Sequence, residues 1–211
     1  MRPACERLSD DHQVLDIDGR RAFAYSTTYF DTSDLRCFVD HIEDRRPRFK
    51  ARSRLYEDTG ECVFEVKLKR SEDETDKRQI DYPKEQRRGL TEDAMGCLKS
   101  ALADAGLEAP EELEATLTTE FESVTLAALD GSERLTCDFG ICLVGQDGNS
   151  VHMHQDLILI ETKSEDGQST ADRELERMPV ETISVSKYRA GHEPGRERPA
   201  IRSAPRTDLF S

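Results

Sequence analysis

Four segments of this chain carry charged or polar residues at every second position, and this alternation is the feature that most constrains the fold. The segments are RFKARSRLY (48–56), CVFEVKLKR (62–70), ERLTCDF (133–139) and LILIETKS (157–164). Side chains along a β-strand alternate between two faces, so each segment presents one charged face and one apolar face. One such strand usually has a solvated face, whereas several together favour a sheet that curls around a polar interior. Because cations and carboxylates both fall on the charged faces, that interior suits a polyanion together with a divalent metal.

Composition limits the partners that such an interior can take. The chain has 211 residues, enough for one domain with a sizeable core, and a formal net charge of −14. An acidic protein with no Trp and 6% aromatic residues is a poor candidate for an RNA-binding module or a base-stacking platform, so we expect no nucleic-acid partner. The segment RRPRFKARSR (45–54) nevertheless holds six cations and no acid. It predicts a bounded anionic ligand, with a solvated basic strand as the alternative.

The cysteines and the apolar residues indicate a cytoplasmic protein. Six cysteines are scattered without a CxxC pair, so zinc-site spacing is absent and we interpret them as reduced thiols. The start, MRPACERLSDDH, has no apolar core of a signal peptide, and no apolar run approaches the ~20 residues of a membrane span. A membrane-protein partner remains compatible with this chain, and its oligomeric state is left open.

The order of predicted elements gives an α+β fold, mainly antiparallel β. Strands are expected at 22–30, 47–57, 61–70, 77–83, 117–128, 133–144 and 151–162, and the segment 183–191 begins as another strand. Helices are expected within 31–42, capped by Thr32 or Ser33, within 91–106, capped by Thr91, and at 169–178. A closed or nearly closed, tunnel-like β-barrel with two or three outer helices explains strands with one polar and one apolar face. We expect one domain over 1–191 and a flexible Pro- and Arg-rich tail over 192–211.

Six blocks in a fixed order resemble a known family. YFDTSDLRCFVDH with RRPRFKARSRLYEDTGECVFEVKLK, then DKRQIDYP, ERLTCDFGI, LILIETKS and SVSKYRAG, are similar to the VTC domain, the polyphosphate polymerase domain of the triphosphate tunnel metalloenzymes, or CYTH-like superfamily. The resemblance implies an antiparallel tunnel that binds ATP, triphosphate or polyphosphate with Mn²⁺ or Mg²⁺. It also implies transfer of the terminal phosphoryl group of ATP to a polyphosphate chain.

The same resemblance assigns roles to individual residues. It places Arg52, Arg54, Lys67, Arg134 and Lys187 in the catalytic set, and it assigns Glu161, with Glu65, to the metal. Substrate binding is expected for Lys50, Lys69, Lys77, Arg78, Lys163 and Ser186. Arg forks and Lys point charges hold phosphate oxygens, and phosphoryl transfer needs charge neutralisation and in-line positioning more than covalent help.

Three departures from the family pattern leave other functions open. The chain starts after a D-R-K-Y strand block, so a barrel strand and one cation are expected to be missing and the barrel to be open there, or sealed by a partner or the N-terminal segment. Glu122 and Ser123 stand where arginines are expected, and Glu122 in the lumen would repel phosphate. Ser184 stands where a further lysine can occur. The alternatives are a diverged paralogue that binds polyphosphate or nucleotide with impaired catalysis, or a tripolyphosphate hydrolase.

Overall fold

One antiparallel sheet organises the chain in the computed structural model, which describes residues 8, 11–71, 74–164, 169–177 and 186–192. The strands are β1 (His12–Val14), β2 (Ala22–Asp31), β3 (Arg48–Tyr56), β4 (Glu61–Lys69), β5 (Thr75–Asp81), β6 (Glu114–Ala128), β7 (Glu133–Gly145), β8 (Ser150–His152) and β9 (Leu159–Ser164). Their order in the sheet is β5-β4-β3-β2-β6-β7-β8, while β1 pairs with β6 and β9 pairs with β7. The helices are α2 (Arg36–Ile42), α3 (Glu92–Ala103), α4 (Thr170–Glu176) and α5 (Lys187–His192), with a 3-10 turn, η1 (Lys84–Gln86).

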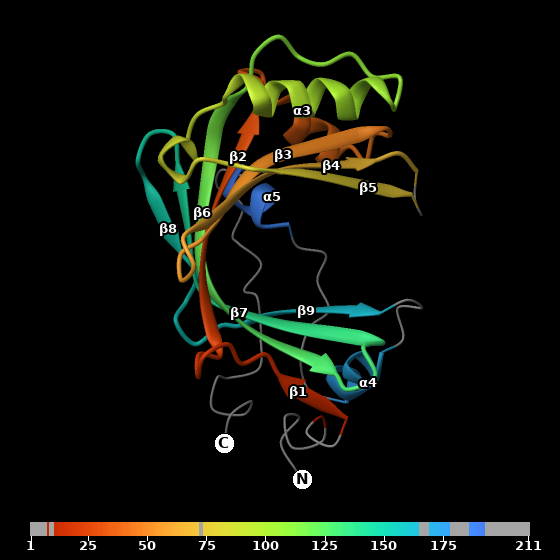
Figure 1. The fold of residues 1–211 in the computed structure, drawn as a ribbon, viewed down its shortest axis with the longest axis vertical. Helices are drawn as coiled ribbons and strands as arrows, with labels where there is room; N and C mark the ends of the chain where they lie inside the picture. Colours follow the sequence, from red (N-terminus) through yellow and green to blue (C-terminus); the bar gives the residue numbers. More distant parts are fainter. Residues whose placement is uncertain (1–7, 9–10, 72–73, 165–168, 178–185, 193–211) are drawn as a thin grey trace.

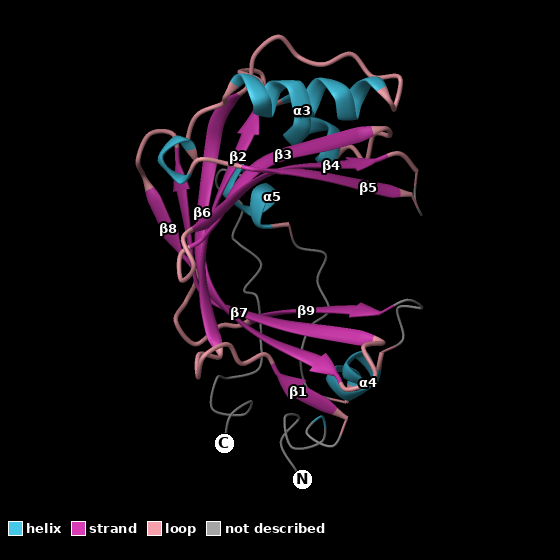
Figure 2. Ribbon diagram, in the orientation of Figure 1, coloured by secondary structure: helices cyan, strands magenta, loops and turns pink. Residues whose placement is uncertain are grey.

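The sheet bends into an open C rather than a closed barrel. Figure 1 shows β3, β4 and β5 above a concave side and β7 and β9 below it, joined through the long strands β2 and β6. Within the part of the chain that the structure describes, β5 and β9 lie at separate edges and do not pair. Closure of a barrel requires every strand to be hydrogen-bonded on both sides. The predicted mainly antiparallel class is therefore confirmed. The described strands do not close into the predicted tunnel-like barrel, and the few helices lie around one open sheet (Figure 2).

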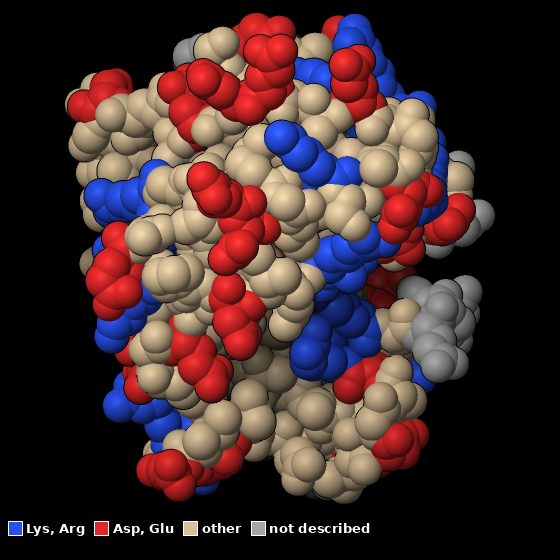
Figure 3. All heavy atoms as spheres, turned by 45° about the horizontal axis from the view of Figure 1, so that its top comes forward, with Lys and Arg blue, Asp and Glu red and all other residues tan. Residues whose placement is uncertain are grey.

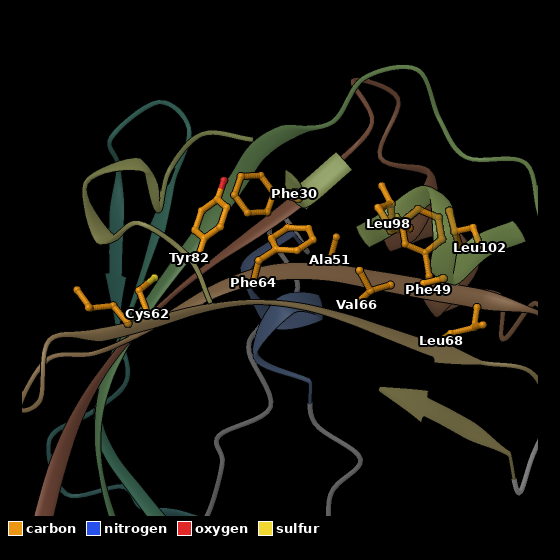
Figure 4. Close-up of a cluster of buried hydrophobic side chains, with 14 residues drawn as sticks. Phe30, Phe49, Ala51, Cys62, Phe64, Val66, Leu68, Tyr82, Leu98 and Leu102 are labelled. Carbon is orange, nitrogen blue, oxygen red and sulfur yellow. The ribbon is translucent and has the colours of Figure 1, made fainter. Parts of the chain in front are cut away.

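Helix α3 covers the convex side of β3, β4 and β5. Thr91 caps it, as predicted, by accepting a hydrogen bond from the backbone N–H of Ala94 at 3.2 Å. The buried core beneath α3 is formed by every second residue of the strands together with one face of the helix (Figure 4). It includes Phe30, Phe49, Ala51, Phe64, Val66, Leu68, Leu98 and Leu102. Because these residues point outward to α3, the alternate residues of β3 and β4 must point to the concave side.

Helix α4 covers the convex side of the other half of the sheet. Its capping box is formed by Ser169 and Asp172, and Ala171 packs with Leu126, Leu135 and Cys137. The two apolar cores thus lie on the same side of one bent sheet. On the concave side, β3 and β4 present the charged residues that alternate with this core, and a smaller apolar cluster of Tyr29, Leu117 and Tyr188 lies there as well.

Three predicted elements differ from the structure. The helix expected within 31–42 is α2, which begins at Arg36, and its N-cap residue is Leu35 rather than the predicted Thr32 or Ser33. The expected strand 151–162 is two strands, because β7 bends at Gly140, whose φ is +62°, and pairs with β9 before that residue and with β8 after it. The end of the expected strand 183–191 is helix α5, while residues 183–185 and the expected tail from 193 onward lie outside the described residues. None of the helices in the described ranges is long and apolar enough to cross a membrane.

Candidate functional site

A row of three lysines crosses the concave face of the sheet. Lys50 on β3, Lys67 on β4 and Lys77 on β5 are direct register partners. Like charges directly opposite one another in a sheet are destabilising, so this row indicates a site for an anion. Burial, the Lys67 ammonium and the neighbouring arginines lower the pKa of Lys50 to about 8. Burial and Lys163 likewise lower the pKa of Lys67.

The buried carboxylate of Glu65 holds two neighbouring cations, Arg52 and Lys77, in position. Arg52 donates from Nε to Glu65 Oε2 at 2.6 Å, and Lys77 forms an ion pair with the other oxygen of Glu65. Burial raises the pKa of Glu65, but the charge of Arg52 and the hydrogen bond from Lys77 outweigh it and leave the pKa below its ordinary value. Arg54 lies further along the same face of β3 and donates from Nε to Thr27 Oγ1 at 3.3 Å. The arginines on this face are therefore held in place before any ligand arrives.

The opposite half of the sheet contributes a second charged group. Leu135 and Cys137 of β7 point into the core beneath α4, so Arg134 points to the concave side. Lys163 on β9 is the register partner of Arg134 and lies 3.1 Å from Glu161. Burial raises the pKa of Glu161, but Lys163, Lys187 and Lys67 lower it overall. Lys67 of the upper half thus interacts electrostatically with Glu161 and Lys163 of the lower half.

Helix α5 brings the last two predicted residues to this side. Lys50 Nζ donates to Ser186 Oγ at 3.1 Å, and Lys187 pairs with Asp138 of β7 and lies 4.4 Å from the ring centre of Phe121. Figure 3 shows Lys and Arg side chains gathered in a hollow at the middle right of that face. The hollow gathers cations on a chain whose net charge is −14.

A hydrogen bond between Asp31 and Tyr188 holds α5 in place and joins two segments that are far apart in the chain. The Asp31 carboxylate is fully buried and accepts hydrogen bonds from the backbone N–H groups of Thr32, Cys37 and Phe38. It also accepts a hydrogen bond from the Tyr188 hydroxyl. Neither Asp31 nor Tyr188 was predicted to have a role, although each stands inside one of the six sequence blocks. Burial and Asp31 together raise the pKa of Tyr188 well above its ordinary value, so its hydroxyl stays neutral.

Three residues lie away from the group that was predicted to gather. Arg78 lies on the convex face, where it hydrogen-bonds Ser100 and pairs with Asp104 of the α3 region. Lys69 shares the face of Lys67 but stands at the end of β4, in register with Arg48. Glu122 is exposed and is the register partner of Ala24 and Phe139, whereas Phe121 and the buried Ser123 beside it point to the concave side. The expectation that Glu122 enters the lumen is therefore wrong: the neighbouring residues Phe121 and Ser123 face the concave side, and Glu122 faces the opposite side of β6.

The two predicted metal ligands come from different strands, and each forms an ion pair with a cation. Glu65 lies on β4 with both oxygens contacted by cations, and Glu161 lies on β9 beside Lys163. Within the described ranges, no group of three or more His, Cys, Asp or Glu side chains is arranged to hold a metal ion.

A group of aromatic rings was not predicted at all. Tyr25 of β2 stacks on Phe121 of β6, with ring centres 5.3 Å apart, and meets Tyr56 of β3 edge-on at 5.4 Å. Tyr56 follows Lys50, Arg52 and Arg54 at the same alternation, and that signal was available in the sequence. The rings were missed because few aromatic residues are present and they come from three separate strands.

The chain was compared with curated proteins, with solved structures and with models of protein families. A search of curated proteins gave no significant match. Among solved structures, the chain is similar to a protein described as a candidate adenylate cyclase from Vibrio parahaemolyticus, with 15% identity, a TM-score of 0.41, and coverage of 82% of this chain and 76% of that chain. The profile of the VTC domain matches residues 1–193, a range that includes every residue that the structure describes. The chain therefore belongs to the VTC domain family, whose fold is that of the tunnel metalloenzymes.

Proposed function

We propose that this protein binds the triphosphate of ATP on its concave face and transfers the terminal phosphoryl group to a polyphosphate chain. The single observation that carries the proposal is the row of Lys50, Lys67 and Lys77, three cations in direct register beside Arg52. Membership of the VTC domain family supports the same substrate class.

The chemistry requires charge neutralisation and alignment of the phosphates. An oxygen at the end of the polyphosphate attacks the terminal phosphorus of ATP, a new P–O bond forms, and the bond to the bridging oxygen breaks to release ADP. The protein contributes by holding the oxygens of both chains in line and by stabilising the charge that spreads over them. Lys67 and Arg52 are placed for the nucleotide phosphates. Arg134, Lys163 and Lys187 on the opposite side are placed for the growing chain.

The metal expected for this reaction, Mn²⁺ or Mg²⁺, would have to arrive with the phosphates, because the carboxylates are already paired with cations. Mg²⁺ in phosphoryl-transfer sites is commonly held by one or two carboxylates together with substrate phosphates. Glu161 is the carboxylate we assign to it. Mn²⁺ alone should therefore bind weakly in a calorimetric titration, and stoichiometric tight binding without triphosphate would contradict this assignment.

The test is synthesis of acid-labile polyphosphate by the purified protein with ATP and Mn²⁺, together with binding of tripolyphosphate. Lys67→Ala should lower the rate of synthesis by about two orders of magnitude, the typical cost of removing a preorganised group that stabilises transition-state charge. It should also weaken the binding of tripolyphosphate. The matched control is Lys99→Ala, which removes an exposed lysine of α3 on the convex side. Glu122→Arg and Arg78→Ala should also leave binding unchanged, because both residues lie outside the concave face.

The outcomes separate the alternatives. Binding of tripolyphosphate without turnover would favour the diverged, binding-only paralogue, and release of inorganic phosphate from tripolyphosphate would favour the hydrolase. Equal loss in Lys67→Ala and Lys99→Ala would contradict the proposed site.

A further inference from the structure

Three aromatic side chains and two cations form a second feature of the concave face. Tyr25, Tyr56 and Phe121 come from β2, β3 and β6, and their rings contact one another through Tyr25. Arg54 Cζ lies 5.8 Å from the ring centre of Tyr25, and Lys187 Nζ lies 4.4 Å from that of Phe121. These two cations are among the charged residues of the concave face described above. The aromatic group is therefore continuous with those charged residues.

The order of residues along β3 gives the aromatic group a direction. Lys50, Arg52, Arg54 and Tyr56 share one face, so successive side chains are about 6.6 Å apart along the strand. Tyr56 is the last residue of β3 and is followed by the exposed turn at 57–59. The ring thus stands where the row of cations reaches solvent.

The outer end of this row is held rigidly. Asp58, in the turn after Tyr56, accepts a hydrogen bond from the backbone N–H of Ala24 at 2.7 Å, and Glu57 N–H donates to the carbonyl of Ala24. Arg20 pairs with the same Asp58. Tyr25 follows Ala24, so the turn and the two tyrosines are fixed as one unit. A rigid ring at a binding site loses little entropy when a flat ligand stacks on it.

We propose that Tyr56, with Tyr25 beside it, is the subsite for the nucleobase of a nucleoside triphosphate. This inference rests on the proposed function, because it assumes that a triphosphate lies along Arg54, Arg52 and the lysine row. Along the ligand the order is phosphates, sugar and base. Along β3 the order is cations and then a half-buried aromatic ring at the solvent end.

The chemistry of the subsite defines its selectivity. Stacking on an aromatic face tolerates any base, since every base has a π-face, and it strengthens with ring area. The aromatic rings supply no hydrogen-bond pattern that distinguishes the edges of adenine and guanine. ATP and GTP should therefore bind comparably, and both should bind more tightly than pyrimidine nucleoside triphosphates.

The experiment compares ATP with tripolyphosphate, which lacks the nucleoside, at one ionic strength. Tyr56→Ala should weaken ATP binding about tenfold, the effect of losing one base–aromatic stack, and change tripolyphosphate binding by less than about twofold. Tyr56→Phe keeps the ring and should restore ATP affinity, and its matched partner Tyr56→Leu keeps only the apolar volume and should not. Thermal unfolding of each variant checks that the fold is retained.

A spectroscopic measurement tests stacking directly, without relying on an affinity. The triphosphate of 2-aminopurine riboside should lose fluorescence on binding to the wild-type protein, and the chain contains no Trp that would obscure the signal. The quenching should persist in Tyr56→Phe and be lost in Tyr56→Leu.

The two proposals fail in different ways. Equal weakening of ATP and tripolyphosphate by Tyr56→Ala would show that the ring only supports Arg54, and it would overturn the nucleobase subsite. Unchanged ATP binding in that variant would overturn it as well. If the wild-type protein binds neither ligand, the proposed function itself fails, and the subsite falls with it.

Discussion

At the scale of single residues, the concave face combines cations that destabilise one another with carboxylates that hold some of them. Lys50 is the extreme case, since it is half-buried near Lys67, Arg48 and Arg52, and it contacts His41 and Ser186. Burial and the nearby lysine and arginines also lower the pKa of His41, to about 4, so His41 adds no positive charge near neutral pH. A phosphate group is the kind of ligand that would relieve this arrangement.

The lowered pKa of Lys50 predicts a loss of tripolyphosphate affinity as the pH rises. Above a pKa of about 8 the free protein loses the Lys50 proton, so affinity should fall about tenfold between pH ~7 and pH ~9. Calorimetric titration across this range should show the slope in the wild type. Lys50→Arg should flatten the slope, since a guanidinium stays charged throughout. An equal slope in both proteins would assign the effect to another group.

The same shift has the opposite sign for the stability of the free protein. The unfolded chain keeps the proton on Lys50 up to its ordinary pKa, so the unfolded state binds more protons above about pH 8. The contribution of Lys50 to the free energy of unfolding therefore increases with pH in this window. As the pH rises through this window, the affinity for tripolyphosphate should fall, whereas the contribution of Lys50 to the free energy of unfolding should increase. A loss of affinity caused by unfolding of the protein would not show these opposite trends.

At the scale of elements, α5 is the helix whose position the site depends on most. It packs on the concave side of β2 and β6, where Tyr188 contacts Tyr29 and the Asp31 carboxylate holds its hydroxyl. The contact is close enough that Gly191 has no room for a side chain, because a Cβ there would overlap the buried Leu117. Ser186 and Lys187 reach the site only if α5 stays in this position.

Gly191→Ala should therefore displace α5 and weaken tripolyphosphate binding. Overpacking of this kind typically costs about 1–3 kcal/mol, which should appear as a lower melting temperature. The control is Gly96→Ala in α3, where an added Cβ meets nothing within 4 Å and the helix should gain about 0.5–1 kcal/mol. Gly191→Ala with unchanged stability and unchanged binding would show that α5 does not hold the site.

At the scale of the whole molecule, charge separates the site from the rest of the surface. Acidic residues outnumber basic ones 44 to 30, yet the concave face gathers lysines and arginines from both halves of the sheet. A short polyanion can enter such a face, whereas a long duplex must also lie along the acidic surface around it.

Thermal unfolding with two polyanions should show this difference. Tripolyphosphate at about 100 times its dissociation constant should stabilise the protein by about 2.7 kcal/mol through mass action. Duplex DNA at the same phosphate concentration and ~0.15 M salt should give no comparable shift. Lys67→Ala should lose the tripolyphosphate effect, and an equal shift with the duplex would contradict a bounded site.

Residues that are neighbours in the chain are enough to predict most of the strands, the starts of two helices and the family. Alternation of charged and apolar residues predicted β3, β4 and β7, and Thr91 and Ser169 mark the starts of α3 and α4, because strand faces and helix caps depend on neighbours in the chain. The six ordered blocks predicted the VTC domain, which the family match confirms. These signals need no knowledge of distant contacts.

The identity of the concave face and of the residues that lie together on it depends on contacts between distant segments. Lys77 and Arg78 were both predicted to bind substrate, yet adjacent residues of a strand point to opposite faces, and the packing of α3 assigns Arg78 to the convex one. Three further features depend on pairing between segments far apart in sequence. They are the open shape of the sheet, the row of lysines and the contact of Asp31 with Tyr188. Such pairing follows from strand register and packing, which alternation along one strand leaves undetermined.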